Sequence, residues 1–217
     1  MMHLPHQDHY ERARDAALER ARARFNAQRM EALGVVVRAE HLEVESLCWR
    51  FAVRLKPVDV RLMPEGEVVD IVWQILLLGY IGAEEAPPPR RFVSFADFAE
   101  GRGYQAAFNG RVLRRLERTV GRERETFVQA AARCGGIYGS DNPLTYLFRF
   151  FPRLELQVIR HEGDEEFPPS CQVLFPDNAP HWMPMENLIV AAERLVSSLE
   201  GKKPTARLAR PPQNPTT

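Results

Sequence analysis

The chain contains little of what marks a secreted, metal-bound or strongly charged protein. Its 217 residues include only three cysteines and three lysines, and 29 basic side chains balance 29 acidic ones. Cys48, Cys134 and Cys171 lie too far apart in sequence for a CxxC pair or another zinc spacing, so we interpret them as buried thiols. An odd, low cysteine count fits a reducing compartment and excludes a disulfide-rich scaffold.

Long hydrophobic runs are also missing from the sequence. The longest apolar stretch, residues 68–83, is interrupted by Asp70, Gln74 and Gly79. It is shorter than the roughly 20 apolar residues that a membrane-spanning helix needs. The first residues do not show the charged, apolar and small-residue succession of a secretory signal. We therefore expect a cytoplasmic protein with no membrane insertion.

The apolar content, 45%, is enough for one sizeable core. Alternating and helical periodicities predict an α+β fold, with a small mixed or antiparallel sheet flanked by helices. We expect an N-terminal helical extension over residues 1–34 and a single α+β domain over residues 35–200. Residues 201–217 are basic and rich in proline, which predicts a disordered tail.

Hydrophobic patterns also place the individual elements. Helices are expected over residues 10–33, 67–82, 104–120, 123–134 and 185–199. A β meander is expected from Val35 to Met63, and three further strands in the segments LTYLFRFF, LELQVIRH and CQVLF. Ser94 and Asp97 have the spacing of a helix-capping box, which predicts a short helical turn.

The densest chemical feature is the segment HEGDEEFPP, residues 161–169, which holds four carboxylates in five positions. Crowded carboxylates repel one another, so at least one should have a raised pKa, or a cation should lie among them. His161, Asp164 and Glu166 are weak candidates for such a metal site. A solvated acidic turn accounts for the same residues, and the sequence leaves both interpretations open.

Other side chains could join this acidic segment after folding. Asp177 follows the strand CQVLF, and Glu186 begins the last helix, where the helix dipole already favours an acid. Cys171 and His161 could approach each other across a hairpin, but neither belongs to a nucleophile motif, so no catalytic residue is identified. The candidate binding surface comprises Asp164, Glu165, Glu166, Phe167, Asp177, Glu186, Tyr104 and Asp141.

Charge is segregated along the chain although the total is zero. Residues 90–133 carry a net charge of +5, residues 134–200 carry −6, and the tail carries +4. The arginines of residues 104–122 are diluted by glutamates and lack an aromatic platform, so we interpret them as a solvated helix face and do not expect nucleic-acid binding. Separate acidic and basic faces favour an interaction protein.

Several segments follow one another in a characteristic order: RFVSFADFAEGRGYQAAFNGRVL, FVQAAARCGGIYGSD, RFFPRLELQVIRHEGDEEFPPSCQVLFPD and MPMENL. As a series they resemble a bacterial and archaeal family of domains of unknown function whose hallmark is GDEEFP. The resemblance covers roughly Val35 to Leu199. It implies an accessory role, because members are common in anaerobes and sometimes occur beside corrinoid or one-carbon enzymes or are joined to iron–sulfur modules.

The chain departs from the family's pattern at some positions. His161 stands where members often have an aromatic residue, and Pro176 is inserted before Asp177, so a histidine-based metal site would be private to this protein. No iron–sulfur cysteine motif is present, and no cofactor is identified. We expect an accessory or assembly protein that binds a cofactor-bearing enzyme, within a larger complex, or its cofactor through the GDEEFP surface. The alternative is a small enzyme that uses Asp164, Glu165 and Glu166 with a divalent metal.

Overall fold

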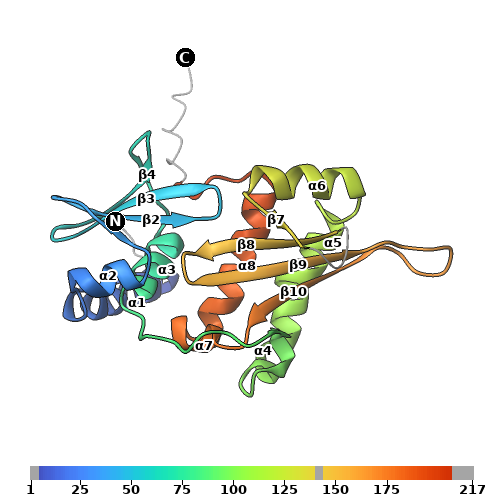
Figure 1. Ribbon diagram of the computed structural model, residues 1–217, viewed down its shortest axis with the longest axis horizontal. Helices are drawn as coiled ribbons and strands as arrows, with labels where there is room; N and C mark the ends of the chain where they lie inside the picture. The colour runs from blue at the N-terminus through green and yellow to red at the C-terminus, as the bar shows by residue number, and fades with distance from the viewer. Residues whose placement is uncertain (1–4, 140–143, 207–217) are drawn as a thin grey trace, which may run out of the picture.

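The computed structural model describes residues 5–139 and 144–206, which form two five-stranded antiparallel sheets and the helices around them (Figure 1). The first sheet is a meander of β1 (Val36–Val37), β2 (Leu42–Ser46), β3 (Trp49–Leu55), β4 (Val58–Met63) and β5 (Glu67–Val68). The second sheet has the order β6 (Phe92–Ser94), β10 (Ser170–Pro176), β9 (Leu154–His161), β8 (Thr145–Phe151) and β7 (Ile137–Tyr138).

The helices divide between the two sheets. Beside the first sheet lie α1 (Pro5–Ala23), α2 (Ala27–Ala32) and α3 (Ile71–Ile81). A 3₁₀ turn, η1 (Phe95–Asp97), follows β6. The second sheet is accompanied by α4 (Gly101–Phe108), the π-helical turn η2 (Asn109–Leu113), α5 (Arg114–Arg118), α6 (Arg124–Arg133), α7 (Ala179–Trp182) and α8 (Met185–Leu199). Figure 1 shows α4, α5 and α8 behind this sheet, so alternate strand residues face these helices.

Aromatic side chains join the two sheets into one hydrophobic core. Trp73 of α3 stacks on Phe51 of the first sheet and on Phe150 of the second, with ring centroids 5.3 and 5.5 Å apart. Tyr80, about two helix turns further along α3, stacks on Phe151 at 4.5 Å. All five rings are fully buried, and such pairs add to the free energy gained by burying apolar area. The core therefore continues from one sheet to the other.

The α+β class is confirmed, but there are two sheets where one was expected. The single helix expected over residues 10–33 is wrong, because the Asn26 side chain accepts hydrogen bonds from the first N–H groups of α2 and starts a new helix there. The helix expected over 67–82 begins only at Ile71. Its N-cap is Asp70, and the two residues Glu67 and Val68 pair with β4 instead.

The remaining differences concern short elements and chain ends. The helix expected over 104–120 begins at Gly101, contains the π turn and ends at Arg118. The expected capping box is confirmed at Ser94, whose N–H and hydroxyl both donate to the Asp97 carboxylate at 2.8 Å. The three expected strands are β8, β9 and β10, whereas β6 and β7 were missed because two or three residues give no periodicity.

The two ends of the described chain are packed against α3 or next to it. Ala17, Leu18 and Ala21 of α1 are buried in the shared core. In the expected tail, Thr205 pairs with Val69, and the Ala206 N–H donates to the Val68 carbonyl at 2.9 Å. Residues 207–217 lie outside the described part. Among the described residues, no helix is both long enough and apolar enough to cross a membrane.

Candidate functional site

The GDEEFP segment is the tip of a hairpin formed by β9 and β10. The strands pair out to His161 and Ser170, and the loop between them extends well beyond the body of the protein (Figure 1). Every residue from Gly163 to Pro168 is exposed. Phe167, with 67% of its surface accessible, is the most exposed large apolar side chain in the described residues. The tip thus presents one aromatic ring among carboxylates.

Asp164 holds the tip in a closed turn. Its Oδ1 accepts hydrogen bonds from the Phe167 N–H at 2.7 Å and the Glu166 N–H at 2.9 Å, and its own N–H donates to the Phe167 carbonyl at 2.9 Å. These backbone donors stabilise the charged carboxylate and hold its pKa below the ordinary value. The expectation of a raised pKa is therefore wrong for Asp164.

Gly163 allows the turn to close. A Cβ at this position would lie 2.7 Å from the Phe167 carbonyl oxygen and 2.7 Å from the Pro169 nitrogen, closer than real side chains approach backbone atoms. No larger residue fits without opening the loop. The signature residues Gly163 and Asp164 thus fix the backbone from which Glu165, Glu166 and Phe167 project.

The base of the hairpin is fastened to the protein by a buried arginine. Arg160 is 2% exposed, and its guanidinium donates to the carbonyls of Gly121 at 2.9 Å and Arg122 at 3.2 Å. It also donates to Glu162 at 2.7 Å, and the hydrogen bond to this cation lowers the pKa of the Glu162 carboxyl. Glu162 lies 3.3 Å from Arg124 as well. The Glu162 carboxylate is therefore paired with two arginines of the protein itself.

The candidate metal residues are not assembled by the fold. Successive residues of β9 alternate between the faces of the sheet, so His161 lies on the face opposite to Arg160. Cys171 pairs with Arg160 in register and packs against Gly121, so it does not meet His161. In residues 5–139 and 144–206, no three His, Cys, Asp or Glu side chains lie close enough together to hold a metal ion.

The other sequence candidates lie elsewhere. The Tyr104 hydroxyl donates to Glu186 at 2.9 Å, which links α4 to the start of α8. The Asp177 carboxylate accepts the Arg90 N–H at 3.0 Å and fastens the proline-rich connector, residues 84–91, to the end of β10. Asp141 lies outside the described residues. Four of the eight candidate residues, Asp164 to Phe167, therefore share the hairpin tip, and the other described ones make separate structural contacts.

Two arginines of the expected solvated face, Arg111 and Arg115, are paired within the protein. Arg115 donates to both carboxylate oxygens of Glu200, at 2.9 and 2.6 Å, and to the Ser197 hydroxyl at 2.9 Å. Arg111 pairs with Glu193, also on α8. Bidentate arginine–carboxylate pairs are strong and directional, so these arginines serve to fix α8 against α5 and η2.

Two cysteines meet although they are far apart in sequence. Cys48 is exposed, so its interpretation as a buried thiol is wrong, whereas Cys134 and Cys171 are buried. A hydrogen bond with the Cys134 thiol holds the pKa of Cys48 below the ordinary value. Burial raises the pKa of Cys171 to about 12, which keeps that thiol protonated. No sequence spacing signalled the contact between Cys48 and Cys134.

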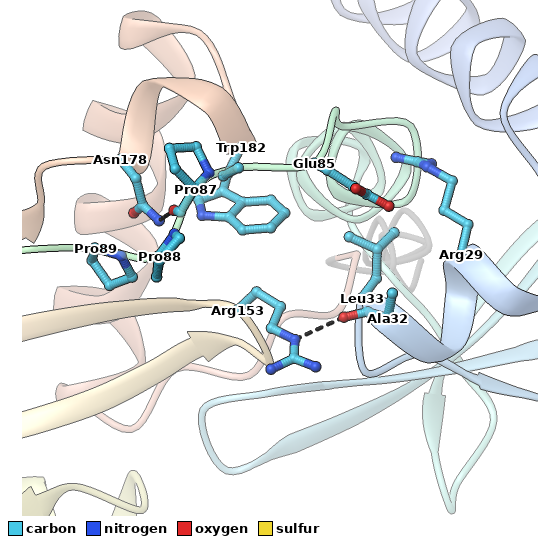
Figure 2. A pocket seen from close by; sticks show the side chains of 11 residues that line it. Arg29, Ala32, Leu33, Glu85, Pro87, Pro88, Pro89, Arg153, Asn178 and Trp182 are labelled. Atoms are coloured by element: carbon cyan, nitrogen blue, oxygen red, sulfur yellow. Dashed lines mark hydrogen bonds between the residues drawn. The ribbon is translucent and has the colours of Figure 1, made fainter.

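The sequence also gave no sign of a pocket between the two sheets. A cavity of about 420 Å³ lies among α2, the proline-rich connector, the turn between β8 and β9, and α7. In Figure 2, Trp182 lies on the side of Pro87 and Asn178, Arg29 and Glu85 lie on the opposite side, and Arg153 lies along one edge. Residues from four separate elements meet only in the folded chain.

The polar groups of this pocket are incompletely paired. Both terminal nitrogens of Arg29, Trp182 Nε1 and Asn178 Oδ1 are buried and have no hydrogen-bond partner among the described residues. The other Asn178 amide atom, Nδ2, donates to the Pro87 carbonyl at 2.7 Å. Burial, with a smaller contribution from nearby Arg24, lowers the pKa of Arg29. Such groups are rare in folded proteins, because an unpaired buried donor costs free energy.

Comparisons with known proteins give one result. A family model described as "Domain of unknown function (DUF3786)" matches residues 26–198. Neither a curated protein nor a solved structure matches the chain. The matched span begins after α1 and includes both the hairpin and the pocket.

Proposed function

Since the chain belongs to the DUF3786 family of domains of unknown function, we propose that it is an accessory or assembly protein that binds a larger, cofactor-bearing enzyme, or that enzyme's cofactor, through the tip of the β9–β10 hairpin. The observation that carries the proposal is Phe167, 67% exposed on a turn that is closed by Asp164. That the partner bears a cofactor rests on the family resemblance of the sequence.

The physical argument combines exposure with rigidity. An aromatic ring in water forgoes the free energy that burial would supply, and aromatic residues anchor many protein interfaces. A loop that is already fixed loses little conformational entropy when it binds, so more of the contact free energy appears as affinity. The exposed carboxylates of Glu165 and Glu166 beside the ring favour a groove rimmed by basic side chains.

Catalysis by the tip carboxylates is not part of the proposal. Asp164 already accepts two backbone hydrogen bonds and has a lowered pKa, which makes it a poor general acid at neutral pH. All residues from Gly163 to Pro168 are exposed, so water is not excluded from this place. No contact at the tip favours bond-making or bond-breaking chemistry over recognition.

Affinity purification of the full chain from its native host tests the proposal. We expect a stoichiometric partner with the unaltered chain, and its loss with Phe167→Ala. The matched control is Phe25→Ala, which removes another exposed phenylalanine, 47% accessible, in the connection between α1 and α2. A visible absorption spectrum of the eluted complex reports a coloured cofactor.

Two results would overturn the proposal. One is recovery of the same partner, in the same amount, with Phe167→Ala. The other is equal loss of the partner with Phe25→Ala, which would place the contact elsewhere.

A further inference from the structure

The pocket between α2 and α7 has the size and lining of a small-molecule site. Its volume of about 420 Å³ lies in the range of roughly 300–1,000 Å³ that is typical of ligand pockets. Leu33 and Pro87 to Pro89 supply apolar walls, and Trp182, 7% exposed, supplies an aromatic one. Such walls bind the apolar body of a ligand, whereas a few polar groups select its head.

The charges of the pocket favour an anion. Arg29 and Arg153 contribute two positive charges, and Glu85 is the only acid among the residues that line the cavity. Arg153 is held in place by a 2.8 Å hydrogen bond from Nε to the Ala32 carbonyl, which leaves its terminal nitrogens to other acceptors. Arg29 forms no ion pair with a described acid and has no acceptor for either terminal nitrogen. An oxyanion can supply the acceptors that the terminal nitrogens of Arg29 lack.

Trp182 adds a second, independent indication. Its indole N–H is buried without an acceptor, and Asn178 Oδ1 nearby is buried without a donor. A ligand that enters the cavity can accept a hydrogen bond from the Trp182 N–H, whereas nothing in the described fold does. Unpaired polar groups on residues that line a cavity are characteristic of binding sites.

We propose that this pocket binds a small organic anion, with a carboxylate or phosphate head at Arg29, a second positive charge from Arg153 at the edge of the cavity, and a planar apolar body against Trp182 and the three prolines. The site is separate from the hairpin tip, so either proposal can fail without the other. It makes the chain a ligand-binding protein in addition to its proposed role as a binding partner.

The test uses the full chain labelled with ¹⁵N and follows the indole N–H signal of Trp182 during titration with four probes. These are naphthalene-2-carboxylate, naphthyl phosphate, the neutral naphthalene-2-carboxamide and inorganic phosphate. We expect both naphthyl anions to shift the signal saturably at submillimolar concentration, and the neutral amide to bind about tenfold or more weakly. The anion that binds with the higher affinity shows whether the site prefers a carboxylate or a phosphate head group.

Variants connect the signal to the residues. Arg29→Gln and Arg153→Gln should each weaken binding about tenfold, whereas Arg114→Gln, an exposed arginine on α5, should not change it. Trp182→Phe keeps an aromatic wall and removes the N–H, so it should weaken binding less and abolish the signal, with naphthyl fluorescence as the readout. Trp182→Phe also tests the pocket if an arginine variant does not fold.

Four outcomes would overturn the proposal. The first is no saturable shift with any anion up to about 10 mM, a concentration well above the dissociation constant of a weak specific site. The second is equal binding of the amide and the carboxylate. The third is binding that survives both arginine substitutions. Binding of inorganic phosphate as tight as that of naphthyl phosphate would remove the apolar body from the proposal and so contradict it.

Discussion

The hairpin and the pocket differ in whether their polar side chains have hydrogen-bond partners within the protein. At the hairpin, two of the four acids that stand out in the sequence are paired: Asp164 within the loop and Glu162 with Arg160 at its base. In the pocket, Arg29 and Trp182 are inconspicuous in the sequence and lack partners once the chain is folded. A dense charged motif thus builds a rigid loop, and scattered residues from four elements leave unpaired groups around a cavity.

The difference suggests two kinds of binding. A loop whose turn is closed by the hydrogen bonds of Asp164 presents the Phe167 ring in a defined position. This arrangement suits a macromolecular partner that covers Phe167. Unsatisfied groups around a cavity offer hydrogen bonds that only a small ligand can reach. Substitution of the paired groups at the base of the hairpin should therefore lower stability. Substitution of the unpaired groups of the pocket should weaken ligand binding with little effect on stability.

The largest effect on stability is expected at the base of the hairpin. Arg160→Leu removes three hydrogen bonds and leaves the carbonyls of Gly121 and Arg122 without this donor. We expect the free energy of unfolding, measured by urea denaturation, to fall by about 3 kcal/mol.

The control for this prediction is Arg149→Leu on the neighbouring strand β8, where the side chain is 56% exposed. Its effect should stay within about 0.5 kcal/mol. Equal effects of the two substitutions would contradict the view that the polar groups at the base of the hairpin are structural.

A smaller and local effect is expected at the tip. Asp164→Ala should speed hydrogen exchange of the Glu166 and Phe167 amides without changing exchange in β9, because the carboxylate binds only the loop. Glu165→Ala, which removes an exposed neighbouring carboxylate, is the control. Unchanged exchange in Asp164→Ala would show that the turn closes without this side chain.

The pH dependence of the same turn has a definite sign. The pKa of Asp164 is lowered in the folded loop, so the carboxylate stabilises the turn above the pKa of an unfolded aspartate, about 3.9. This stabilisation is lost as the pH falls through the folded pKa. The Phe167 amide shift should follow the titration with a midpoint below 3.9, and a midpoint at or above that value would contradict the assignment.

The sequence predicted those parts of the fold that depend on local pattern. Strands β8 to β10 and the cap at Ser94 follow from alternation and from spacing between near neighbours. The break at Asn26 was missed because helix formers continue on both sides of it, and the cap forms only when its side chain turns back to α2. β6 and β7 were missed because they are too short for any period.

The two candidate sites differ in the same way: the hairpin tip could be recognised from the sequence, and the pocket could not. The exposed tip lies within one short segment, so its composition alone marked it. The pocket requires Arg29, Arg153 and Trp182 to meet from distant parts of the chain, and the contact between Cys48 and Cys134 has the same origin. Tertiary packing creates such sites, and no spacing in the sequence encodes them.

The smallest effect on stability is expected in the pocket, and it is the sharpest test of the comparison. Arg29→Met keeps the length of the side chain and removes a half-buried cation whose terminal nitrogens have no acceptor. We expect the free energy of unfolding to stay within about 0.5 kcal/mol or to rise, since an unpaired buried charge costs free energy that an apolar side chain does not.

Arg22→Met provides the matched control, because Arg22 is also half-buried but donates two hydrogen bonds to the Leu55 carbonyl. That loss should lower the free energy of unfolding by about 1–2 kcal/mol. If Arg29→Met is as destabilising as Arg22→Met, the pocket arginine has a structural role and the contrast with the hairpin fails. If Arg29→Met is neutral for folding and weakens anion binding, folding does not account for this charge and ligand binding does.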